Sequence, residues 1–227
     1  MLKRLREPET LRKVCHDLAH GIEGWENQVG ANGWDRVFVS AVRQERLQSL
    51  EGLNMLEVAE TLGMAPEEAF LHLIVEEQGQ MTILIFHMDE SDVDQVVRAP
   101  FSMIGSDGLP LRSGRPHPRL YGTFPRFFKR YVRETRSLTL EEAVRKVTVL
   151  PAERFHLTDH GMIAVGKVAD LVIFDPATIK DLATYEQPRV YPEGMSAVVV
   201  SGQIVVREKQ LTPHRPGQLI ASSHGEA

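Results

Sequence analysis

The chain has 227 residues, of which 42% are hydrophobic and 25% are charged, a composition typical of a globular protein with a packed core. Its formal net charge of −5 argues against a nucleic-acid partner or an anionic membrane. No apolar run approaches the roughly 18 residues that a membrane span requires. The single cysteine, Cys15, excludes an internal disulfide and favours a reducing compartment, most simply the cytoplasm.

The first part of the chain predicts helices that alternate with short strands. The helical patterns occupy residues 9–19, 54–62 and 66–78, followed by a short helix that carries Val93, Val96 and Val97 after a Ser91–Asp94 capping pair. The strand patterns occupy residues 36–42, the nearly continuous apolar run 81–86, and residues 101–104. We expect the run 81–86 to be buried on both faces. Residues 23–34, rich in Gly and Asn, predict a loop.

This alternation predicts an α/β fold with parallel strands and crossover helices. In such sheets the chemistry gathers at the carboxyl ends of the strands. Asp107 comes shortly after the predicted strand 101–104, so we expect its carboxylate at such an end.

The pattern changes after two further helices, predicted over residues 123–133 and 140–149. Short strands then follow, over residues 161–166, 170–176 and 195–207, the last folded into a hairpin at Ser201-Gly202. We therefore predict a domain boundary near Asp159, which divides residues 1–158 from a small β layer in residues 159–227. The last dozen residues are polar, and we expect a frayed end.

Asp107 allows two interpretations. In the first, Ser106-Asp107-Gly108 is an ordinary turn in which the carboxylate accepts a hydrogen bond from a nearby backbone N–H. In the second, the neighbouring glycines let the backbone present the carboxylate to a pocket as a general base or a metal ligand. The residue pattern alone leaves both open.

The sequence Arg115-Pro116-His117-Pro118-Arg119 predicts a loop that two prolines stiffen. It is either a solvated basic loop or a clamp for a substrate carboxylate, because the arginine fork suits a carboxylate well.

Three histidines are weaker candidates for metal ligands. His16 and His20 lie four residues apart on the first long predicted helix, as in zinc-protease helices, but Asp17 stands between them where those helices carry the glutamate base. We expect this pair to face water. His87 ends an apolar strand and is either a ligand or a histidine at the rim of the sheet.

Trp25 and Trp34 either line an apolar pocket or anchor their loop. The chain has no His-x-His after a strand, no Cys-x-x-Cys, no glycine-rich phosphate loop and no Gly-x-Ser-x-Gly. A metal enzyme with Asp107 as its one evident ligand would be incomplete.

Several longer stretches together resemble the D-aminoacylase (N-acyl-D-amino-acid deacylase) branch of the amidohydrolase superfamily. The most specific are residues 102–108, SMIGSDG, and residues 115–126, RPHPRLYGTFPR. The resemblance continues through residues 33–37, GWDRV, residues 88–93, MDESDV, residues 169–176, ADLVIFDP, and the hairpin 198–206.

The resemblance implies that residues 1–158 are the last part of a (β/α)8 barrel and residues 159–227 part of a small β-sandwich. It implies a zinc enzyme that hydrolyses the amide of small-molecule N-acyl-D-amino acids. In the family, a metal-bound water attacks the carbonyl, and the residue in the place of Asp107 takes its proton and passes it to the leaving amine. Ser106, Gly108, His117 and Arg119 would then border the substrate.

The sequence departs from the family in its length, because a (β/α)8 barrel alone needs about 250 residues. The strands that carry the family's zinc ligands are absent, and Cys15 is not in the family's ligand context. We therefore expect most zinc ligands to come from outside this chain, with Asp107 as a possible contact. One hypothesis is the C-terminal portion of a deacylase. Another is a catalytically incomplete scaffold that binds a complementary chain, and a third is a separate metal site on the His16/His20 helix.

Overall fold

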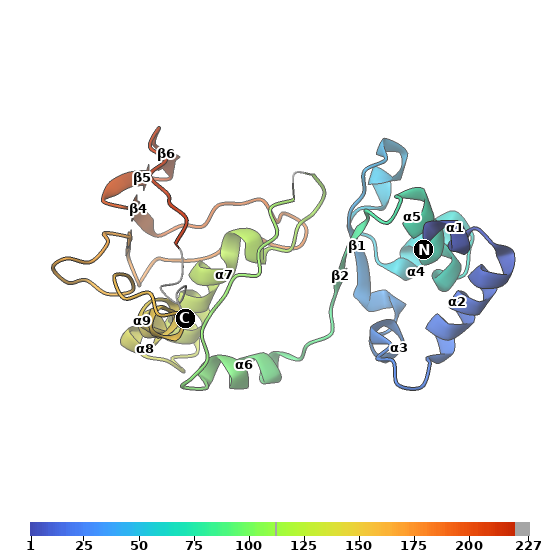
Figure 1. Cartoon of the computed structure of the whole chain (residues 1–227), viewed down its shortest axis with the longest axis horizontal. Helices are drawn as coiled ribbons and strands as arrows, with labels where there is room; N and C mark the ends of the chain where they lie inside the picture. Colours follow the sequence, from blue (N-terminus) through green and yellow to red (C-terminus); the bar gives the residue numbers. More distant parts are fainter. Residues whose placement is uncertain (112, 221–227) are drawn as a thin grey trace, which may run out of the picture. The chain divides into compact units, whose positions relative to one another are not determined.

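A computed structural model describes residues 1–111 and 113–220, and residues 221–227 of the expected frayed end lie outside the described residues. The contacts divide the chain into two compact units, each of which we describe by itself (Figure 1). Unit 1 consists of residues 1–89, 109–117 and 184–189. Unit 2 consists of residues 90–108, 118–183 and 190–227. The boundary expected near Asp159 separates a barrel portion from a sandwich portion and stays a prediction.

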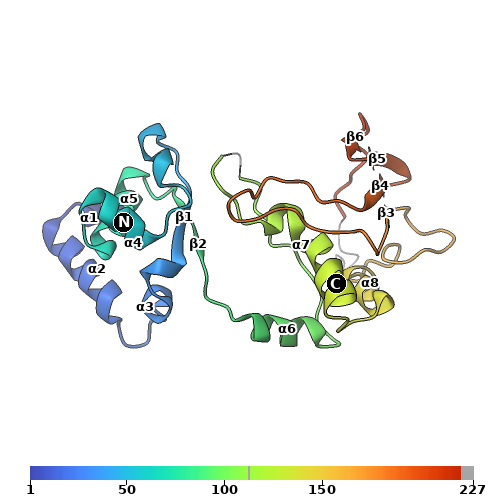
Figure 2. The ribbon, with the colours of Figure 1, turned by 180° about the vertical axis from the view of Figure 1, so that it is seen from behind.

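Unit 1 is a short antiparallel pair of strands with helices packed to one side (Figures 1 and 2). Its elements are α1 (Leu2–Leu5), α2 (Pro8–His20), α3 (Gln28–Asn32), η1 (Trp34–Arg36), β1 (Val37–Ala41), η2 (Glu45–Leu50), α4 (Met55–Leu62), α5 (Pro66–Glu76) and β2 (Thr82–Ile85). The predicted helices and both strands of this part are confirmed, whereas the loop expected over residues 23–34 contains the short helix α3.

The ends of α4 and α5 follow local rules. Asn54 and Glu57 form a capping box, in which each side chain accepts a hydrogen bond from the other's backbone N–H, at the start of α4. Gly63 then ends this helix in the left-handed conformation, at φ 65°. Pro66 begins α5 at a position where its missing N–H has no partner to lose. These signals explain why the sequence predicted both helices.

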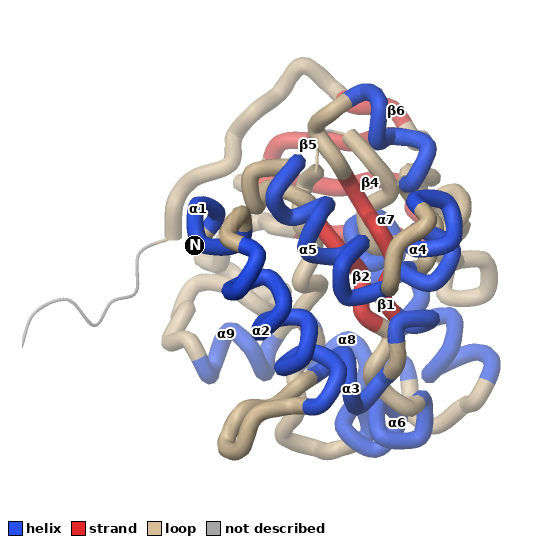
Figure 3. Tube along the Cα trace, turned by 90° about the vertical axis from the view of Figure 1, so that its right-hand side faces the viewer, coloured by secondary structure: helices blue, strands red, loops and turns tan. Residues whose placement is uncertain are grey.

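The expectation of parallel strands is wrong for β1 and β2, which pair antiparallel with Val37 opposite Ile85 and Val39 opposite Ile83. Figure 3 shows the two strands side by side in red. The connection between them carries η2, α4 and α5 and is long enough for either a parallel crossover or an antiparallel return. The alternation of elements did not reveal this difference. β2 is also half-buried along its length, not covered on both faces as its apolar run predicted.

The core of unit 1 lies between β1 and the helices. Val37, Val39, Met55, Val58 and Leu73 are fully buried there. Because burying such a side chain contributes about 1.5–3 kcal/mol, this cluster accounts for much of the stability of the unit.

Unit 2 combines helices with a four-stranded antiparallel sheet in the order β3-β4-β5-β6. Its elements are α6 (Glu90–Arg98), α7 (Arg119–Phe127), the π-helix η3 (Phe128–Glu134), α8 (Leu140–Val147), α9 (Val149–Arg154), β3 (Leu171–Phe174), β4 (Met195–Val200), β5 (Gln203–Arg207) and β6 (Gln210–Leu211). The predicted helices of this part and the strands over 170–176 and 195–207 are confirmed. Among residues 1–111 and 113–220, no helix is long and apolar enough to cross a bilayer.

The turn between β4 and β5 is the one expected. Ser201 and Gly202 both have positive φ, 47° and 76°, as a two-residue hairpin turn of the primed type requires. The strand expected over residues 161–166 is wrong, because this segment forms bends and turns. Gly161, at φ 85°, lies so close to α9 that an added Cβ would be 2.6 Å from the Cβ of Ala152.

The strand expected over residues 101–104 is also wrong, so Asp107 does not follow a strand in this structure. The chain leaves α6 in a turn, because the Ser102 backbone N–H and hydroxyl both donate to the carbonyl of Ala99, over 3.1 and 2.9 Å. Such local bonding by serine competes with sheet pairing. The short apolar run did not signal this turn.

Asp94 ties α6 to the π-helix, and the capping pair expected with Ser91 stays a prediction. Its carboxylate accepts hydrogen bonds from the Tyr131 hydroxyl at 2.8 Å and from the Arg130 guanidinium at 3.1 Å. Tyr131 is 5% exposed. Burial, followed by the hydrogen bond to Asp94, raises the pKa of Tyr131 to about 12 from an ordinary value of 10.0.

We expect this tyrosine to make unit 2 sensitive to alkali. Because its pKa is higher in the folded than in the unfolded chain, the protonated phenol stabilises the fold fully below about pH 10 and loses that contribution between about pH 10 and 12. The difference is worth about 3 kcal/mol. Urea unfolding at about pH 9 and about pH 11 checks it, since Tyr131→Phe should lose less stability than the wild type between the two. Equal losses in the two proteins would contradict the assignment.

Candidate functional site

Asp107 lies in the loop before α7. Its backbone φ is 46°, a left-handed conformation that is uncommon for residues other than glycine and costs conformational free energy. Its Oδ2 atom is 2.7 Å from Nη2 of Arg119, the first residue of α7. The Asp107 side chain is 78% exposed, and that of Arg119 is 36% exposed. The carboxylate is therefore held by a cation and presented outward, and is not folded back onto its own turn.

The residues beside Asp107 fix this loop. The Gly108 N–H donates to the Ser106 hydroxyl at 3.3 Å. In the turn predicted at Ser106-Asp107-Gly108, the acceptor of the backbone N–H is therefore the serine hydroxyl and not the Asp107 carboxylate. An added Cβ at Gly108 would lie 3.1 Å from the Leu120 Cα, so a larger residue would push the loop away from α7. Ser106 and Gly108 thus set the geometry that brings Asp107 to Arg119.

A buried lysine, which the sequence analysis did not single out, anchors the chain that leads to Asp107. Lys146 of α8 is 4% exposed. Its ammonium donates to the Ala99 carbonyl and to the carbonyl and hydroxyl of Ser102, the latter two at 3.2 and 3.0 Å. The Ile104 N–H in turn donates to the Lys146 carbonyl at 3.3 Å. Burial is the main cause that lowers the pKa of Lys146, because it disfavours the charged ammonium.

His117 belongs to unit 1, on a loop that runs along β1. The Arg115 N–H donates to the Ser40 carbonyl, and the Ser40 hydroxyl donates to the Arg115 carbonyl, both at 2.7 Å. Gly114 allows this approach, because it has φ 72° and an added Cβ would be 2.5 Å from the Ser40 carbonyl oxygen. Nε2 of His117 lies 3.1 Å from the Tyr185 hydroxyl.

The structure thus brings together, within unit 2, four of the five residues predicted for the site, namely Ser106, Asp107, Gly108 and Arg119. The fifth, His117, is held within unit 1. Arg115 packs its guanidinium against Gly52, where an added Cβ would be 2.4 Å from Nη1, so it supports the loop by packing.

The histidines and tryptophans that were weaker candidates lie outside the loop that carries Asp107. His16 and His20 stack at 4.3 Å on the exposed face of α2, and Nδ1 of His20 contacts the His16 carbonyl at 2.9 Å. His87 is exposed. Trp34 donates to Glu67 at 2.9 Å and packs on the unit 1 core, so it anchors its loop, whereas Trp25 is 48% exposed.

The part of the chain that the structure describes contains no cluster of three or more His, Cys, Asp or Glu side chains able to hold a metal ion. The donor set of these residues, with Asp107 paired to a guanidinium, does not by itself fit a zinc centre. That the zinc ligands come from outside the chain stays a prediction.

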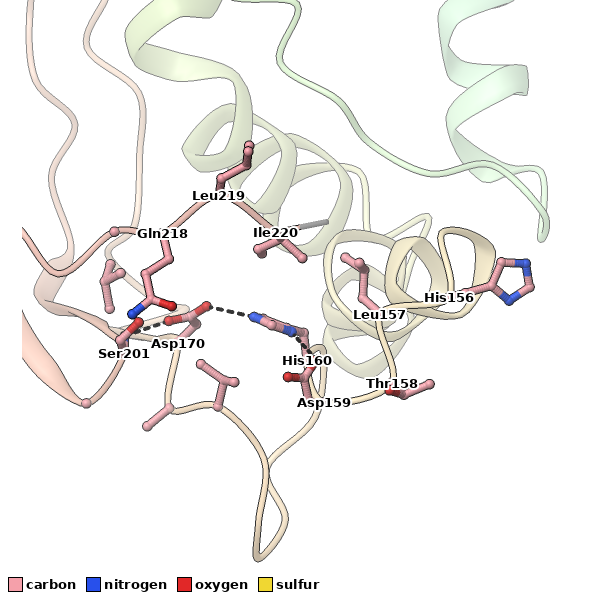
Figure 4. Close-up of a pocket in the computed structure, with 15 residues that line it drawn as sticks. His156, Leu157, Thr158, Asp159, His160, Asp170, Ser201, Gln218, Leu219 and Ile220 are labelled. Carbon is pink, nitrogen blue, oxygen red and sulfur yellow. Dashed lines mark hydrogen bonds and ion pairs between the residues drawn. The ribbon is translucent and has the colours of Figure 1, made fainter. Parts of the chain in front are cut away.

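Unit 2 also has an open cavity of about 800 Å³ that the sequence analysis missed (Figure 4). His160 lies at its wall between two carboxylates, with Nδ1 2.6 Å from Asp159 and Nε2 3.6 Å from Asp170. The hydrogen bond from His160 is the main cause that lowers the pKa of Asp159. Asp170 also accepts from the Ser201 N–H at 2.7 Å, so the group ties the hairpin turn to the start of β3.

Comparison with known proteins places these residues in a family. The profile of the amidohydrolase family matches residues 16–206, which is most of the chain. The chain belongs to the amidohydrolase family. The match includes Asp107 and Arg119.

Three of the relatives compared are deacylases. D-aminoacylase of Alcaligenes xylosoxydans xylosoxydans is 41% identical over 172 residues, 76% of this chain and 34% of that protein. N-acyl-D-glutamate deacylase of the same organism is 45% identical over 137 residues, 60% of this chain and 28% of that protein. N-acyl-D-aspartate deacylase, also of that organism, is 39% identical over 170 residues, covering 75% and 33%. The chain therefore spans about a third of the length of these relatives.

Solved amidohydrolases share the fold. N-acyl-D-glutamate deacylase from Bordetella bronchiseptica, in complex with zinc and a phosphonate that mimics the tetrahedral intermediate, superposes with a TM-score of 0.74 at 35% identity, over 85% of this chain and 39% of that one. A D-aminoacylase with a binuclear metal centre superposes with a TM-score of 0.71 at 37% identity, over 79% and 36%. The α/β fold of the chain is thus that of amidohydrolases related to D-aminoacylase.

Proposed function

We propose that this amidohydrolase chain provides the C-terminal portion of a zinc-dependent enzyme that hydrolyses N-acyl-D-amino acids to a carboxylate and a free D-amino acid. The observation that carries the proposal is the carboxylate of Asp107, held at positive φ and paired to Arg119 in the segment that most resembles the deacylases. Within this proposal, residues 1–158 are the last part of a (β/α)8 barrel and residues 159–227 part of a β-sandwich. The single cysteine supports the cytoplasm as the compartment.

Asp107 acts as the general base and acid of this reaction. Its carboxylate accepts a proton from the attacking water and returns it to the amine nitrogen as the amide C–N bond breaks. Zinc, held by residues from outside this chain, would supply the activation of water. The Arg119 pairing holds the carboxylate in one orientation, which such proton transfer needs.

Arg119 and His117 border the substrate. A guanidinium has five N–H donors, so Arg119 can keep Asp107 and bind the carboxylate of the amino acid at the same time. Ser106 and Gly108 keep the loop in the shape that this geometry requires. His117 contributes a neutral polar contact or a cation, according to its protonation.

The test is to supply the amino-terminal region that the relatives possess, either fused to this chain or as a separate chain, and to assay hydrolysis of N-acetyl-D-amino acids and their L-isomers. We expect zinc-dependent release of the D-amino acid. A zinc-loaded, folded assembly that releases none of a panel of D-amino acids would contradict the proposal.

A second function is favoured by the exposed apolar side chains of unit 2. Val172 and Ile173 of β3 are 53% and 54% exposed, and Ile163 and Val165 are 91% and 106% exposed. Apolar surface of this kind usually contacts another surface. On this reading the chain is a catalytically incomplete scaffold that binds a complementary chain carrying the metal ligands.

Metal analysis and sedimentation test the scaffold, and activity of the assembly with the amino-terminal region separates it from the enzyme. A scaffold should bind no stoichiometric zinc alone and should form a one-to-one complex with the amino-terminal region of a relative. Tight stoichiometric zinc in the isolated 227-residue chain would contradict the scaffold. If zinc then disappears from the double variant His16→Ala/His20→Ala, the metal lies on α2.

A further inference from the structure

A short segment far along the chain holds the loop that carries His117. Residues 184–189 belong to unit 1, although the residues on either side of them belong to unit 2. Two of its side chains, Tyr185 and Arg189, contact the loop 109–117 within that unit. The hypothesis for the reaction assigns neither residue a role.

Arg189 binds the loop through its main chain. Its Nη2 atom donates to the carbonyls of Leu111 and Ser113 at 2.9 and 2.8 Å, and both Nε and Nη2 lie 3.4 Å from the Gly114 carbonyl. A planar guanidinium can contact several carbonyls at once, whereas a lysine ammonium offers a single point of contact. Arg189 therefore holds together the main chain of the turn that precedes His117.

Tyr185 contacts His117 directly. Its hydroxyl is 3.1 Å from Nε2, and the two rings meet edge to face with centroids 5.1 Å apart. The other side of the Tyr185 ring packs on Phe86, at 4.7 Å, which in turn packs on Phe38 of β1 at 5.2 Å. The tyrosine thus links the imidazole to the strand pair of unit 1.

The segment also interacts electrostatically with the loop. Hydrogen bonds from the backbone N–H of Glu186 and from the Thr184 side chain are the main causes that lower the pKa of Glu186, and the charge of Arg115 lowers it further. Contacts with residues 111, 113, 114 and 117 therefore come from one six-residue segment.

We propose that Tyr185 and Arg189 are positioning residues of the loop that carries His117. Arg189 fixes the main chain of this loop, and Tyr185 fixes the orientation and tautomer of His117. This inference rests on the proposed function in one respect, because that function provides the substrate that His117 would contact. A phenol is the stronger donor of this pair, so the Tyr185 O–H donates to Nε2, and the neutral imidazole carries its proton on Nδ1.

The tautomer is measured on the 227-residue chain by two-bond ¹H–¹⁵N correlation spectra of the imidazoles at a pH where His117 is neutral. We expect one tautomer, protonated at Nδ1, in the wild type and in Tyr191→Phe, the control at another exposed tyrosine. Tyr185→Phe keeps the ring packing and removes the hydroxyl, so His117 should lose the single-tautomer signature. An unchanged His117 spectrum in Tyr185→Phe, or a wild type protonated at Nε2, overturns this part.

The Arg189 contact is measured by hydrogen exchange. The Arg115 N–H, bonded to Ser40, reports whether the loop lies on β1, and the Gly52 N–H, bonded to Val39, reports on the strand itself. In Arg189→Lys we expect the Arg115 N–H to exchange about tenfold faster, since one to two net hydrogen bonds are lost, with Gly52 unchanged. The matched control is Arg207→Lys on β5. Equal exchange rates of the Arg115 N–H in Arg189→Lys and in the wild type would contradict the positioning role of Arg189.

These measurements need no enzymatic activity, so they fail separately from the proposed function. Loss of the tautomer signature and of loop protection supports the positioning role, even in a chain that never hydrolyses an N-acyl-D-amino acid. Conversely, an active assembly could show the same His117 tautomer and the same Arg115 exchange rate in both variants as in the wild type. That result would support the deacylase and contradict the positioning role.

Discussion

Asp107→Asn is expected to lower kcat of the assembled enzyme by at least about 10²-fold, the usual contribution of a general base or acid. The amide preserves the size of the side chain and its contact with Arg119 but cannot accept and return a proton at neutral pH. KM should change less than kcat, because the substrate contacts remain. Steady-state kinetics on an N-acyl-D-amino acid, with zinc content measured in parallel, check the expectation.

The control for this experiment is Asp92→Asn, an exposed aspartate on α6 that should leave kcat and KM unchanged. Zinc content should also be equal in wild type and both variants. Full activity in Asp107→Asn would falsify the assigned role, whereas a lost activity together with lost zinc would reassign Asp107 from proton transfer to metal binding.

Lys146→Ala is expected to destabilise unit 2 by about 2–4 kcal/mol, through an empty volume and three oxygen acceptors that lose their buried donor. Lys146→Met refills most of the volume without a donor, so we expect a smaller loss, about 1–2 kcal/mol. Urea unfolding followed by circular dichroism measures both.

Arg145→Ala is the matched control, because it removes a neighbouring cation of α8 whose ion pair with Glu153 is exposed and 3.5 Å long. Exposed pairs of this kind contribute about 0–1 kcal/mol. If Lys146→Ala costs no more than Arg145→Ala, the buried ammonium does not anchor the segment that leads to Asp107.

Elements with complete local signals could be predicted from the sequence. The helix predicted from residue 54 and the hairpin turn predicted at Ser201-Gly202 are settled within a few residues, and the structure confirms both. Elements whose outcome depends on distant partners could not. Residues 101–104 are apolar enough for a strand, but the Ser102 hydrogen bonds to Ala99 and the Lys146 contacts turn the chain instead.

The site could be predicted where the residues lie close in sequence. Ser106, Asp107, Gly108 and Arg119 fall within one motif, and the structure joins them in one unit. Their catalytic and substrate-binding roles stay predictions. Lys146 and Arg189 gave no signal, because a buried lysine resembles a surface one in sequence and Arg189 meets its carbonyls across more than 70 residues.

Unit 1 is assembled from three stretches of polypeptide, residues 1–89, 109–117 and 184–189. No single cut can therefore release it as an intact piece. A gene truncated at residue 158 would encode most of this unit while removing Tyr185 and Arg189, and a circular permutant opened between residues 118 and 183 would keep all three stretches on one polypeptide. Dissection of the protein into independently expressed domains thus has to follow its contacts and not its linear order.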